Sequence, residues 1–312
     1  MLTTARCLVV GEALVDVVGG VPHPGGSPMN VAVGLSRLGL ETRLLTRIGD
    51  DPHGRMLGEH LAREGVAVVP TSMRAGERTS RAVAVIGADG AAAYDFDVEW
   101  EVSAEVAIAE AAGVDVVHVG SLGAVLDPGA DAVRAMIDAV PDGILRTYDP
   151  NIRGELLGPR AAATERVEAI MAASHIVKLS DEDAEWLYPG CPIDDVLARV
   201  IALGARLAVV TRGGDGCVSL IEGGAGPVER EAPPVQVVDT IGAGDSFMSG
   251  LIHGVVSDGL VPALAGDVFH PDARDLTRFE RVTEAALAGA AVTVSRRGAN
   301  PPRLSELAIS SR

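Results

Sequence analysis

Short apolar runs alternate along the chain with segments whose apolar residues recur every three or four positions. Short apolar runs are typical of buried strands, and the longer period is typical of helices that cover a sheet. The pattern predicts strands at 6–10, 44–48, 114–119, 144–148, 175–179 and 207–211, with a further short apolar segment at 66–69. It predicts helices at 29–38, 52–64, 103–112, 129–140, 160–172, 192–203, 243–257 and 275–295.

The repeated order of strand and then helix predicts the fold class. Parallel strands need a crossover connection, which a helix usually supplies. We therefore expect an α/β fold of three layers, with a mostly parallel central sheet covered by helices on both faces. Segments 218–221 and 228–231 are expected edge strands, and 261–275 is an expected surface loop. No linker rich in Gly, Pro or Ser divides the chain, so a single domain over 1–312 is predicted.

One segment departs from this rhythm and predicts a hairpin over 81–98. Its arms flank the sequence Gly-Ala-Asp-Gly at 87–90, and residues 94–97 alternate between aromatic and acidic side chains. Alternation of this kind is typical of a strand with one polar face. A hairpin inserted into a chain of parallel strands and helices indicates an excursion from the main sheet, such as a lid.

Composition favours a folded protein without a membrane span. Of 312 residues, 47% are hydrophobic and 22% charged, which is enough apolar material for a large core. No stretch approaches the roughly 20 apolar residues that cross a bilayer. Glu12 and Asp16 interrupt the first apolar run, which argues against a signal peptide. We expect a soluble, cytoplasmic protein.

Charge and cysteine spacing exclude further classes. The chain has 26 basic and 43 acidic residues, a net charge of −17, which argues against nucleic acid as a partner. Cys7, Cys191 and Cys217 lie far apart, so they predict neither a disulfide framework nor a zinc site. Cys7 and Cys217 fall in apolar runs and are expected in the core. The single lysine, Lys178, is expected at the surface, with its ammonium group in water.

The strongest chemical signal is the segment 238–247, which follows an apolar segment and opens a predicted helix. Gly242, Ala243 and Gly244 allow a tight turn that points backbone N–H groups toward an anion at a helix N-terminus. Asp245 then falls in the first helical turn. It is either a helix cap or a general base that takes a proton from an attacking hydroxyl.

A second glycine-rich segment covers 24–39. Gly25 and Gly26 permit close approach of a ligand, and the Asn30 amide can both donate to and accept from sugar hydroxyls. Asn30 alone is equally explained as a residue in the first turn of a helix. Asp16, upstream, is either a charged residue at a sheet edge or an acceptor for hydroxyl groups.

Two further loops follow predicted strands, where open α/β sheets bind ligands. Arg153 can hold a phosphate or the substrate, or form a surface ion pair. The segment 211–216 contains three glycines and is either a simple turn or a loop that contacts a nucleotide.

Together, these segments resemble the ribokinase-like carbohydrate kinases, the PfkB family. The resemblance rests on the glycine-rich segment at 25–39 and on Asp-Thr-Ile-Gly-Ala-Gly-Asp-Ser-Phe at 239–247, and it extends from Gly11 to about Pro302. It implies a ribokinase-like fold with a small β-sheet lid, built from strands near 12–20 and 81–98. It also implies Mg-ATP as the phosphoryl donor and a sugar alcohol as the acceptor.

The resemblance assigns roles to particular residues. Asp245 matches the family's catalytic base, and 242–245 match its anion hole. The positions matching sugar-binding residues are Asp16, Gly25, Gly26, Asn30 and Arg153. The positions matching ATP-binding residues are Ser180, Asp183, Thr211, Gly213, Gly216 and Gly244. A homodimer formed through the lid is a further expectation.

Several segments are closer to fructokinase than to ribokinase: 11–16, 25–35, 149–153, 178–183 and 295–302. Other positions depart from the family pattern. Ser180 and Asp183 stand where many members have Asn and Glu, and Asp183 is the expected carboxylate for Mg²⁺, acting through water. The family's monovalent cation site maps onto Asp239 with carbonyls that include those of Ile241 and Gly298. Pro302, however, replaces a small polar residue of ribokinases and argues against activation by K⁺.

The resemblance therefore implies an ATP-dependent sugar kinase that converts D-fructose to fructose 6-phosphate. The alternatives within the family are kinases for 2-keto-3-deoxygluconate, ribose or a nucleoside. A protein that binds sugar and nucleotide without catalysis is the non-enzymatic alternative. The chain has no Gly-x-x-x-x-Gly-Lys-Ser/Thr motif and no Gly-x-Gly-x-x-Gly turn after its first strand, which argues against P-loop kinases and Rossmann dehydrogenases.

Overall fold

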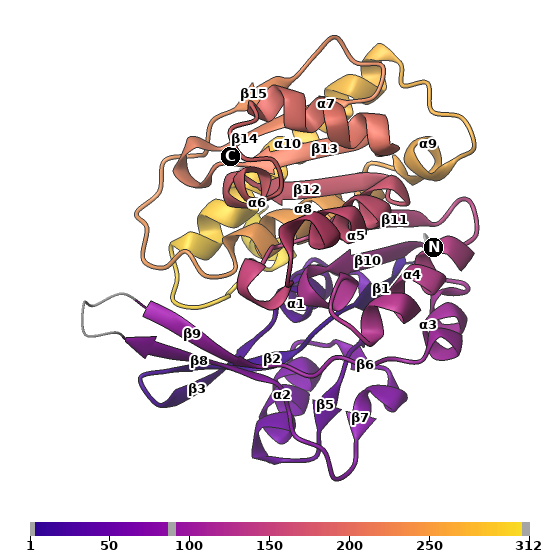
Figure 1. Cartoon of the computed structure of the whole chain (residues 1–312). Coiled ribbons are helices and arrows are strands. Elements are labelled where there is room, and N and C mark those ends of the chain that lie inside the picture. Colours follow the sequence, from indigo (N-terminus) through magenta and orange to yellow (C-terminus); the bar gives the residue numbers. More distant parts are fainter. Residues whose placement is uncertain (1–3, 87–91, 308–312) are drawn as a thin grey trace.

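Nine strands form the central sheet of the computed structural model, which describes residues 4–86 and 92–307 (Figure 1). In spatial order they are β15 (Val228–Arg230), β14 (Cys217–Ile221), β13 (Leu207–Thr211), β12 (Ile176–Ser180), β11 (Leu145–Asp149), β10 (Val116–Gly120), β1 (Arg6–Val10), β4 (Glu41–Leu45) and β6 (Ala67–Val68). The strands from β6 to β13 pair in parallel, and β14 and β15 add antiparallel pairs at one edge. The parallel arrangement that the pattern predicts is confirmed.

Helices cover both faces of this sheet, as Figure 1 shows. One hydrophobic core is shared with α3 (Ala104–Ala111), α4 (Gly129–Ala139), α5 (Arg160–Ala172), α6 (Asp181–Leu187) and α7 (Ile193–Leu203). The other is shared with α1 (Ser27–Arg37), α2 (Pro52–Arg63), α8 (Ala243–Ser257), α9 (Val261–Ala265) and α10 (Ala273–Val294). Successive strand residues face opposite sides, so Leu8 and Val10 enter the first core while Cys7 and Val9 enter the second.

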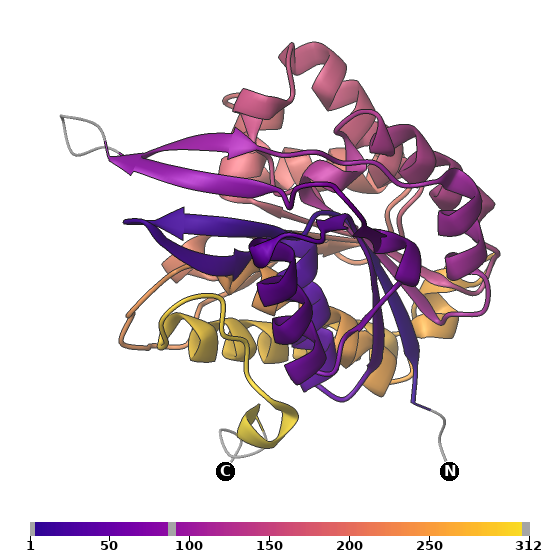
Figure 2. The same ribbon diagram turned by 90° about the horizontal axis from the view of Figure 1, so that it is seen from below.

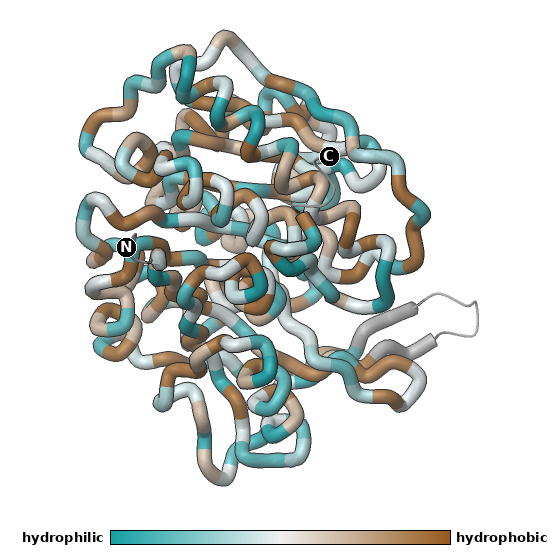
Figure 3. The backbone as a smooth tube through the Cα atoms, turned by 180° about the vertical axis from the view of Figure 1, so that it is seen from behind, coloured by the Kyte–Doolittle hydropathy of each residue, from teal (hydrophilic) through white to brown (hydrophobic). Residues whose placement is uncertain are grey.

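Short helices complete the connections: η1 (Pro70–Ser72), η2 (Ser121–Ala124), η3 (Gly154–Leu156), η4 (Gly213–Asp215) and α11 (Leu304–Leu307). In Figure 3, hydrophobic and hydrophilic residues interchange along the outer helices, as expected for helices with one buried face. Within residues 4–86 and 92–307, no helix is both long and apolar enough to span a membrane.

A second sheet projects from one side of the body (Figure 2). It consists, in spatial order, of β3 (Val21–Gly25), β2 (Leu14–Val18), β8 (Arg81–Ile86) and β9 (Ala92–Asp97). The strands β2 and β8 are parallel, and the two outer pairs are antiparallel. The expected turn at 87–90 lies outside the described residues. A further two-stranded sheet joins β5 (Ile48–Gly49) to β7 (Met73–Arg74).

Three local predictions differ from the structure. β3 is not among the strands that the sequence predicts. Pro22 and Pro24 fit this strand because it lies at an edge, where the missing N–H groups cost little. The predicted strand 44–48 divides into the end of β4 and the short β5. The expected loop 261–275 contains α9 and the start of α10.

The contact between α1 and α8 determines where the two glycine-rich motifs meet. Gly34 of α1 lies against Ser249 of α8, where a Cβ at position 34 would be 2.7 Å from the serine Cβ. The missing side chain therefore allows close approach of the two helices. Their N-terminal ends carry the residues that the sequence selected for catalysis.

We expect Gly34→Ala to lower the free energy of unfolding by about 1–3 kcal/mol, because the added methyl group overpacks this contact. A Cβ on Gly58, inside α2, would have no neighbouring atom within 4 Å, so Gly58→Ala should raise stability by about 0.5–1 kcal/mol. Urea unfolding of both variants measures the difference. Equal effects of the two substitutions would contradict the packing argument.

Candidate active site

Asp245 lies at the start of α8, where its carboxylate receives two hydrogen bonds from α1. The Ser27 hydroxyl donates to Oδ1 at 2.6 Å, and the Asn30 amide donates to Oδ2 at 2.8 Å. Ser27 and Asn30 are three residues apart, so they share one face of the first turn of α1. The N-cap of α8 is Gly242, with no side-chain cap. Asp245 is therefore not the helix cap, the simpler of its two sequence interpretations.

The backbone before Asp245 requires glycine. Gly242 has a φ of 75°, and a Cβ there would lie 2.7 Å from the Ala299 Cβ. Only glycine adopts this conformation without strain and without displacing Ala299. Gly242, Ala243 and Gly244 thus begin a helix whose first N–H groups have no helical acceptors. The Ala243 N–H donates to the Thr240 carbonyl at 3.2 Å, so the N–H groups of Gly244 and Asp245, together with the helix dipole, are the ones that can bind an anion.

Lys178 contradicts the expectation of a surface lysine. Its side chain is buried and forms a 2.8 Å ion pair with Asp149 Oδ2. A Cβ on Gly244 would lie 3.0 Å from Lys178 Nζ, so the ammonium group adjoins the N-terminus of α8. Burial lowers the pKa of Lys178, but the nearby carboxylates of Asp149 and Asp183 outweigh it and raise the pKa. The lysine is therefore charged and adds to the positive potential at the N-terminus of α8.

Asp149 keeps one oxygen without a hydrogen-bond partner. Oδ1 is buried and unpaired among the described residues. Burial raises the pKa of Asp149 to about 6, although Lys178 opposes the shift. An orphaned carboxylate oxygen in the interior is costly, and it marks a place where a further donor or cation fits.

Three residues of the expected sugar side meet where the projecting sheet leaves the body. A Cβ on Gly25 would lie 2.0 Å from Asp16 Oδ2, and a Cβ on Gly26 would lie 2.7 Å from the Glu12 carbonyl oxygen. Gly26, which has a φ of 104° and lies against backbone, therefore requires glycine, whereas a side chain at position 25 would displace the Asp16 carboxylate. Burial raises the pKa of Asp16, and Arg153 opposes that shift.

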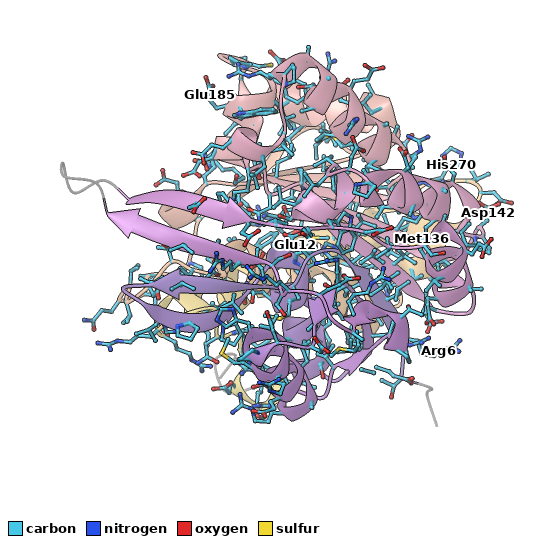
Figure 4. The ribbon with its side chains drawn as sticks, turned by 60° about the horizontal axis from the view of Figure 1, so that its bottom comes forward. Arg6, Glu12, Met136, Asp142, Glu185 and His270 are labelled. Atoms are coloured by element: carbon cyan, nitrogen blue, oxygen red, sulfur yellow. The ribbon has the colours of Figure 1, made fainter. Side chains whose placement is uncertain are left out.

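Glu12 is a buried acid at the same junction, as Figure 4 shows. Its Oε2 accepts a hydrogen bond from the Gly123 N–H at 2.9 Å. Burial raises its pKa from 4.5 to about 7, partly offset by Ser121, Gly123 and Arg153. The exposed Arg153 has no ion-pair partner within the described ranges, so the surface ion pair considered from the sequence does not form there.

The expected nucleotide residues lie at the carboxyl ends of β12 and β13, where Ser180 and Thr211 are paired neighbours. Ser180 and Asp183 form a reciprocal cap of α6, and Asp183 Oδ1 also accepts from the Ile152 N–H at 2.7 Å. Both oxygens of Asp183 thus hold backbone groups. A water molecule on Mg²⁺ would have to share them.

Two of the three glycines of the 211–216 loop lie at the ends of η4: Gly213 is its first residue, and Gly216 follows its last. Gly213 has a φ of 53°, and a Cβ on Gly216 would lie 2.0 Å from the Arg230 carbonyl oxygen. The loop turns sharply into β14. The Thr211 hydroxyl is engaged locally, donating to the Leu179 carbonyl at 3.3 Å.

The residues expected at a monovalent cation site are brought together by Asp239. Its carboxylate accepts from the Gly298 N–H at 2.8 Å and from the Ile241 N–H at 3.1 Å. These bonds lower the pKa of Asp239. The carboxylate therefore joins the segment before α8 to the segment after α10.

Sequence reasoning missed Ser27, Glu12 and Asp149 as site residues. Each lies inside a segment already selected for its pattern, at 25–35, 11–16 and 149–153. Their common signal was proximity to the end of a strand or the start of a helix. What identifies them individually is burial and partners, which require the tertiary structure.

Residues 4–306 match the family described as pfkB family carbohydrate kinase. The chain is 31% identical to a probable fructokinase of Arabidopsis thaliana, over 97% of this chain and 91% of that protein. It is 32% identical to a fructokinase of Klebsiella pneumoniae, over 82% and 86%. Its fold resembles that of a fructokinase of Xylella fastidiosa solved with bound ATP, with a TM-score of 0.81, 22% identity and 98% of both chains covered. An aminoimidazole riboside kinase of Salmonella enterica gives 0.78 at 23% identity, over 97% and 99%.

The buried acid Glu12 predicts a pH-dependent stability. Because the pKa of Glu12 is raised in the folded state, this side chain contributes fully to folding stability below its ordinary pKa of 4.5. That contribution is lost as the pH rises through about 7. We therefore compare the free energy of unfolding of Glu12→Gln with that of the parent protein. As the pH is raised from about 5 to about 8, the variant should gain about 2–3 kcal/mol relative to the parent protein.

Denaturant unfolding at the two pH values measures this change. Glu64 is the control, because Arg37 hydrogen-bonds to it and lowers its pKa to about 2. Glu64→Gln should destabilise the protein equally at both pH values. A parallel pH response in Glu12→Gln and the parent protein would contradict the assignment.

Proposed function

The chain belongs to the pfkB family of carbohydrate kinases, and we propose that it transfers the γ-phosphoryl group of ATP to the hydroxymethyl group of D-fructose, giving fructose 6-phosphate. The observation that carries this proposal is the carboxylate of Asp245 at the start of α8, beside the glycine turn that begins at Gly242. A base and an anion-binding helix terminus at one place are what transfer between an alcohol and a phosphate requires.

Asp245 acts as the general base. The sugar hydroxymethyl group donates its proton to the carboxylate, and its oxygen bonds to the γ-phosphorus. The bond from the γ-phosphorus to the oxygen that bridges it to the β-phosphorus breaks, and ADP leaves. The hydrogen bonds from Ser27 and Asn30 hold the carboxylate in place before the sugar arrives. Such preorganisation removes the need to reorient the base during reaction.

The N-terminus of α8 receives the charge on the transferred group. We assign the developing charge to the N–H groups of Gly244 and Asp245, and the buried ammonium group of Lys178 adds positive charge beside them. Mg²⁺ bound to ATP would supply further positive charge there. The unpaired Oδ1 of Asp149 and the backbone-bound carboxylate of Asp183 fit a metal held by few protein ligands and by the phosphates.

We assign the sugar to the junction between the projecting sheet and the body. We assign its hydroxyl contacts to Asp16, the close-approach backbone of Gly25 and Gly26, the Asn30 amide and Arg153. Asn30 donates one N–H to Asp245, which leaves its Oδ1 for a sugar hydroxyl. The strands β2, β3, β8 and β9 form the lid that excludes water from the reaction.

We assign nucleotide contacts to Ser180, Asp183, Thr211, Gly213, Gly216 and Gly244. A monovalent cation would lie near Asp239, Ile241 and Gly298, although Asp239 already serves two backbone N–H groups. A homodimer through the lid stays a prediction. Val18 and Val21, at the turn between β2 and β3, are exposed apolar residues that suit such a contact.

A substrate panel tests the choice of sugar. We expect ADP release with fructose at a kcat/KM at least about tenfold above that with ribose, 2-keto-3-deoxygluconate or adenosine, a difference of about 1.4 kcal/mol in transition-state binding. A preference for 2-keto-3-deoxygluconate would replace fructose as the substrate, and it would make Arg153 or Arg81 the candidate partner of the substrate carboxylate. Binding of sugar and ATP without ADP release would indicate a non-catalytic protein.

The role of Asp245 is tested by Asp245→Asn. We expect the rate to fall on the order of 10²–10⁴, because the amide cannot take the proton. Asparagine has a similar shape, so the fold and ATP affinity should persist, as measured by thermal unfolding and by calorimetric titration with ATP. Turnover close to that of the parent protein would refute the assignment.

A further inference from the structure

Asp245, the general base of the proposed function, already accepts a hydrogen bond from a hydroxyl group of the protein. Ser27 Oγ lies 2.6 Å from Asp245 Oδ1, a short hydrogen bond of the kind formed by a hydroxyl to a carboxylate. A substrate alcohol must reach the same carboxylate at a similar distance to lose its proton. Ser27 therefore occupies one of the acceptor directions that an attacking nucleophile could use.

The backbone fixes the position of this hydroxyl. Ser27 is the first residue of α1, and it is followed by Pro28, which restricts the helix start. Gly26, before it, lies against the Glu12 carbonyl so closely that a Cβ would be 2.7 Å from the oxygen. Ser27 is 6% exposed and Asp245 9% exposed. The hydroxyl is thus held between two elements that cannot easily move apart.

The carboxylate of Asp245 has about four acceptor directions, and Ser27 and Asn30 take two of them. Water is the nucleophile that competes with sugar in any kinase of this design, because it is small, abundant and able to donate a proton to the same base. A water that reached Oδ1 beside bound ATP would be activated as the sugar hydroxyl is.

We propose that Ser27 is a positioning residue that keeps water off Asp245 Oδ1 and so couples ATP consumption to the presence of sugar; this rests on the proposed kinase function. Removal of the Ser27 hydroxyl leaves a space of about one oxygen atom beside the Asp245 carboxylate. A water molecule then takes its place and donates to Oδ1.

The uncoupled reaction in the variant is a hydrolysis. The water proton passes to Asp245, the water oxygen bonds to the γ-phosphorus, and the bond from the γ-phosphorus to the oxygen that bridges it to the β-phosphorus breaks. The products are ADP and inorganic phosphate. No oxidant or further reactant is needed.

The test compares Ser27→Ala with the parent protein by ADP release at saturating Mg-ATP, with and without fructose. We expect the sugar-independent rate itself to rise about tenfold or more, and with it the ratio of sugar-independent to fructose-dependent rate, since a positioned base accelerates proton transfer by at least that factor. A ratio that rises only because the fructose-dependent rate falls would reflect poorer positioning of the base and would contradict the proposal. Ser27→Gly deletes the same hydroxyl and gives a second measurement if the alanine variant folds poorly. Ser27→Thr retains a hydroxyl and should restore the low ratio.

Ser249→Ala is the matched control. Ser249 is a buried serine of the same helix pair, but its hydroxyl donates to the Ser246 carbonyl at 3.0 Å. Its loss should leave the ratio unchanged, which separates the loss of this one hydroxyl from general loosening of the α1–α8 contact. Adding Asp245→Asn to Ser27→Ala should abolish the extra hydrolysis, because the base is then absent.

The outcomes separate the two proposals. A parent protein that releases no ADP with any sugar defeats the proposed function. A parent protein active on fructose, with an unchanged ratio in both Ser27→Ala and Ser27→Gly, defeats the role of Ser27 alone. A rise of equal size in Ser249→Ala also defeats it.

Discussion

The hydrogen bonds from α1 to the carboxylate of Asp245 are the constraint on which the site depends. They join two motifs that are more than two hundred residues apart in sequence. The join is possible because Gly34 lets α1 approach α8 and because Gly242 turns the chain into α8 without a cap. A carboxylate with two donors is held in one orientation, and the orientation decides where an alcohol must lie.

Several buried ionisable side chains lie near Asp245, and only some of them have a partner of opposite charge. Lys178 pairs with Asp149, while Asp149 Oδ1 has no partner among the described residues and Glu12 has a pKa near neutrality. Burying such groups lowers stability unless each is paired. The carboxyl ends of the parallel strands therefore carry buried charged groups that are only partly paired. Such groups are expected where a bound ligand supplies the missing partners.

The sequence predicted most of the architecture from local pattern. The parallel strands follow from their short apolar runs, and the helices α2, α4 and α7 follow from their apolar period, which the residues impose without tertiary context. Prediction failed where context overrides the pattern. Two prolines fit β3 because it is an edge strand, and Lys178 is buried because Asp149 on the neighbouring strand offers a carboxylate.

By itself, the sequence determined the fold class, the glycine turn before Asp245 and the resemblance to carbohydrate kinases, since these depend on residues close together in the chain. Only the tertiary structure decided the partners of each charged group. It showed that Ser27 and Asn30 hold Asp245, that Asp183 binds backbone and that Glu12 is buried. Partners come from elements distant in sequence, and their distances depend on helix packing and strand order, which no local pattern specifies.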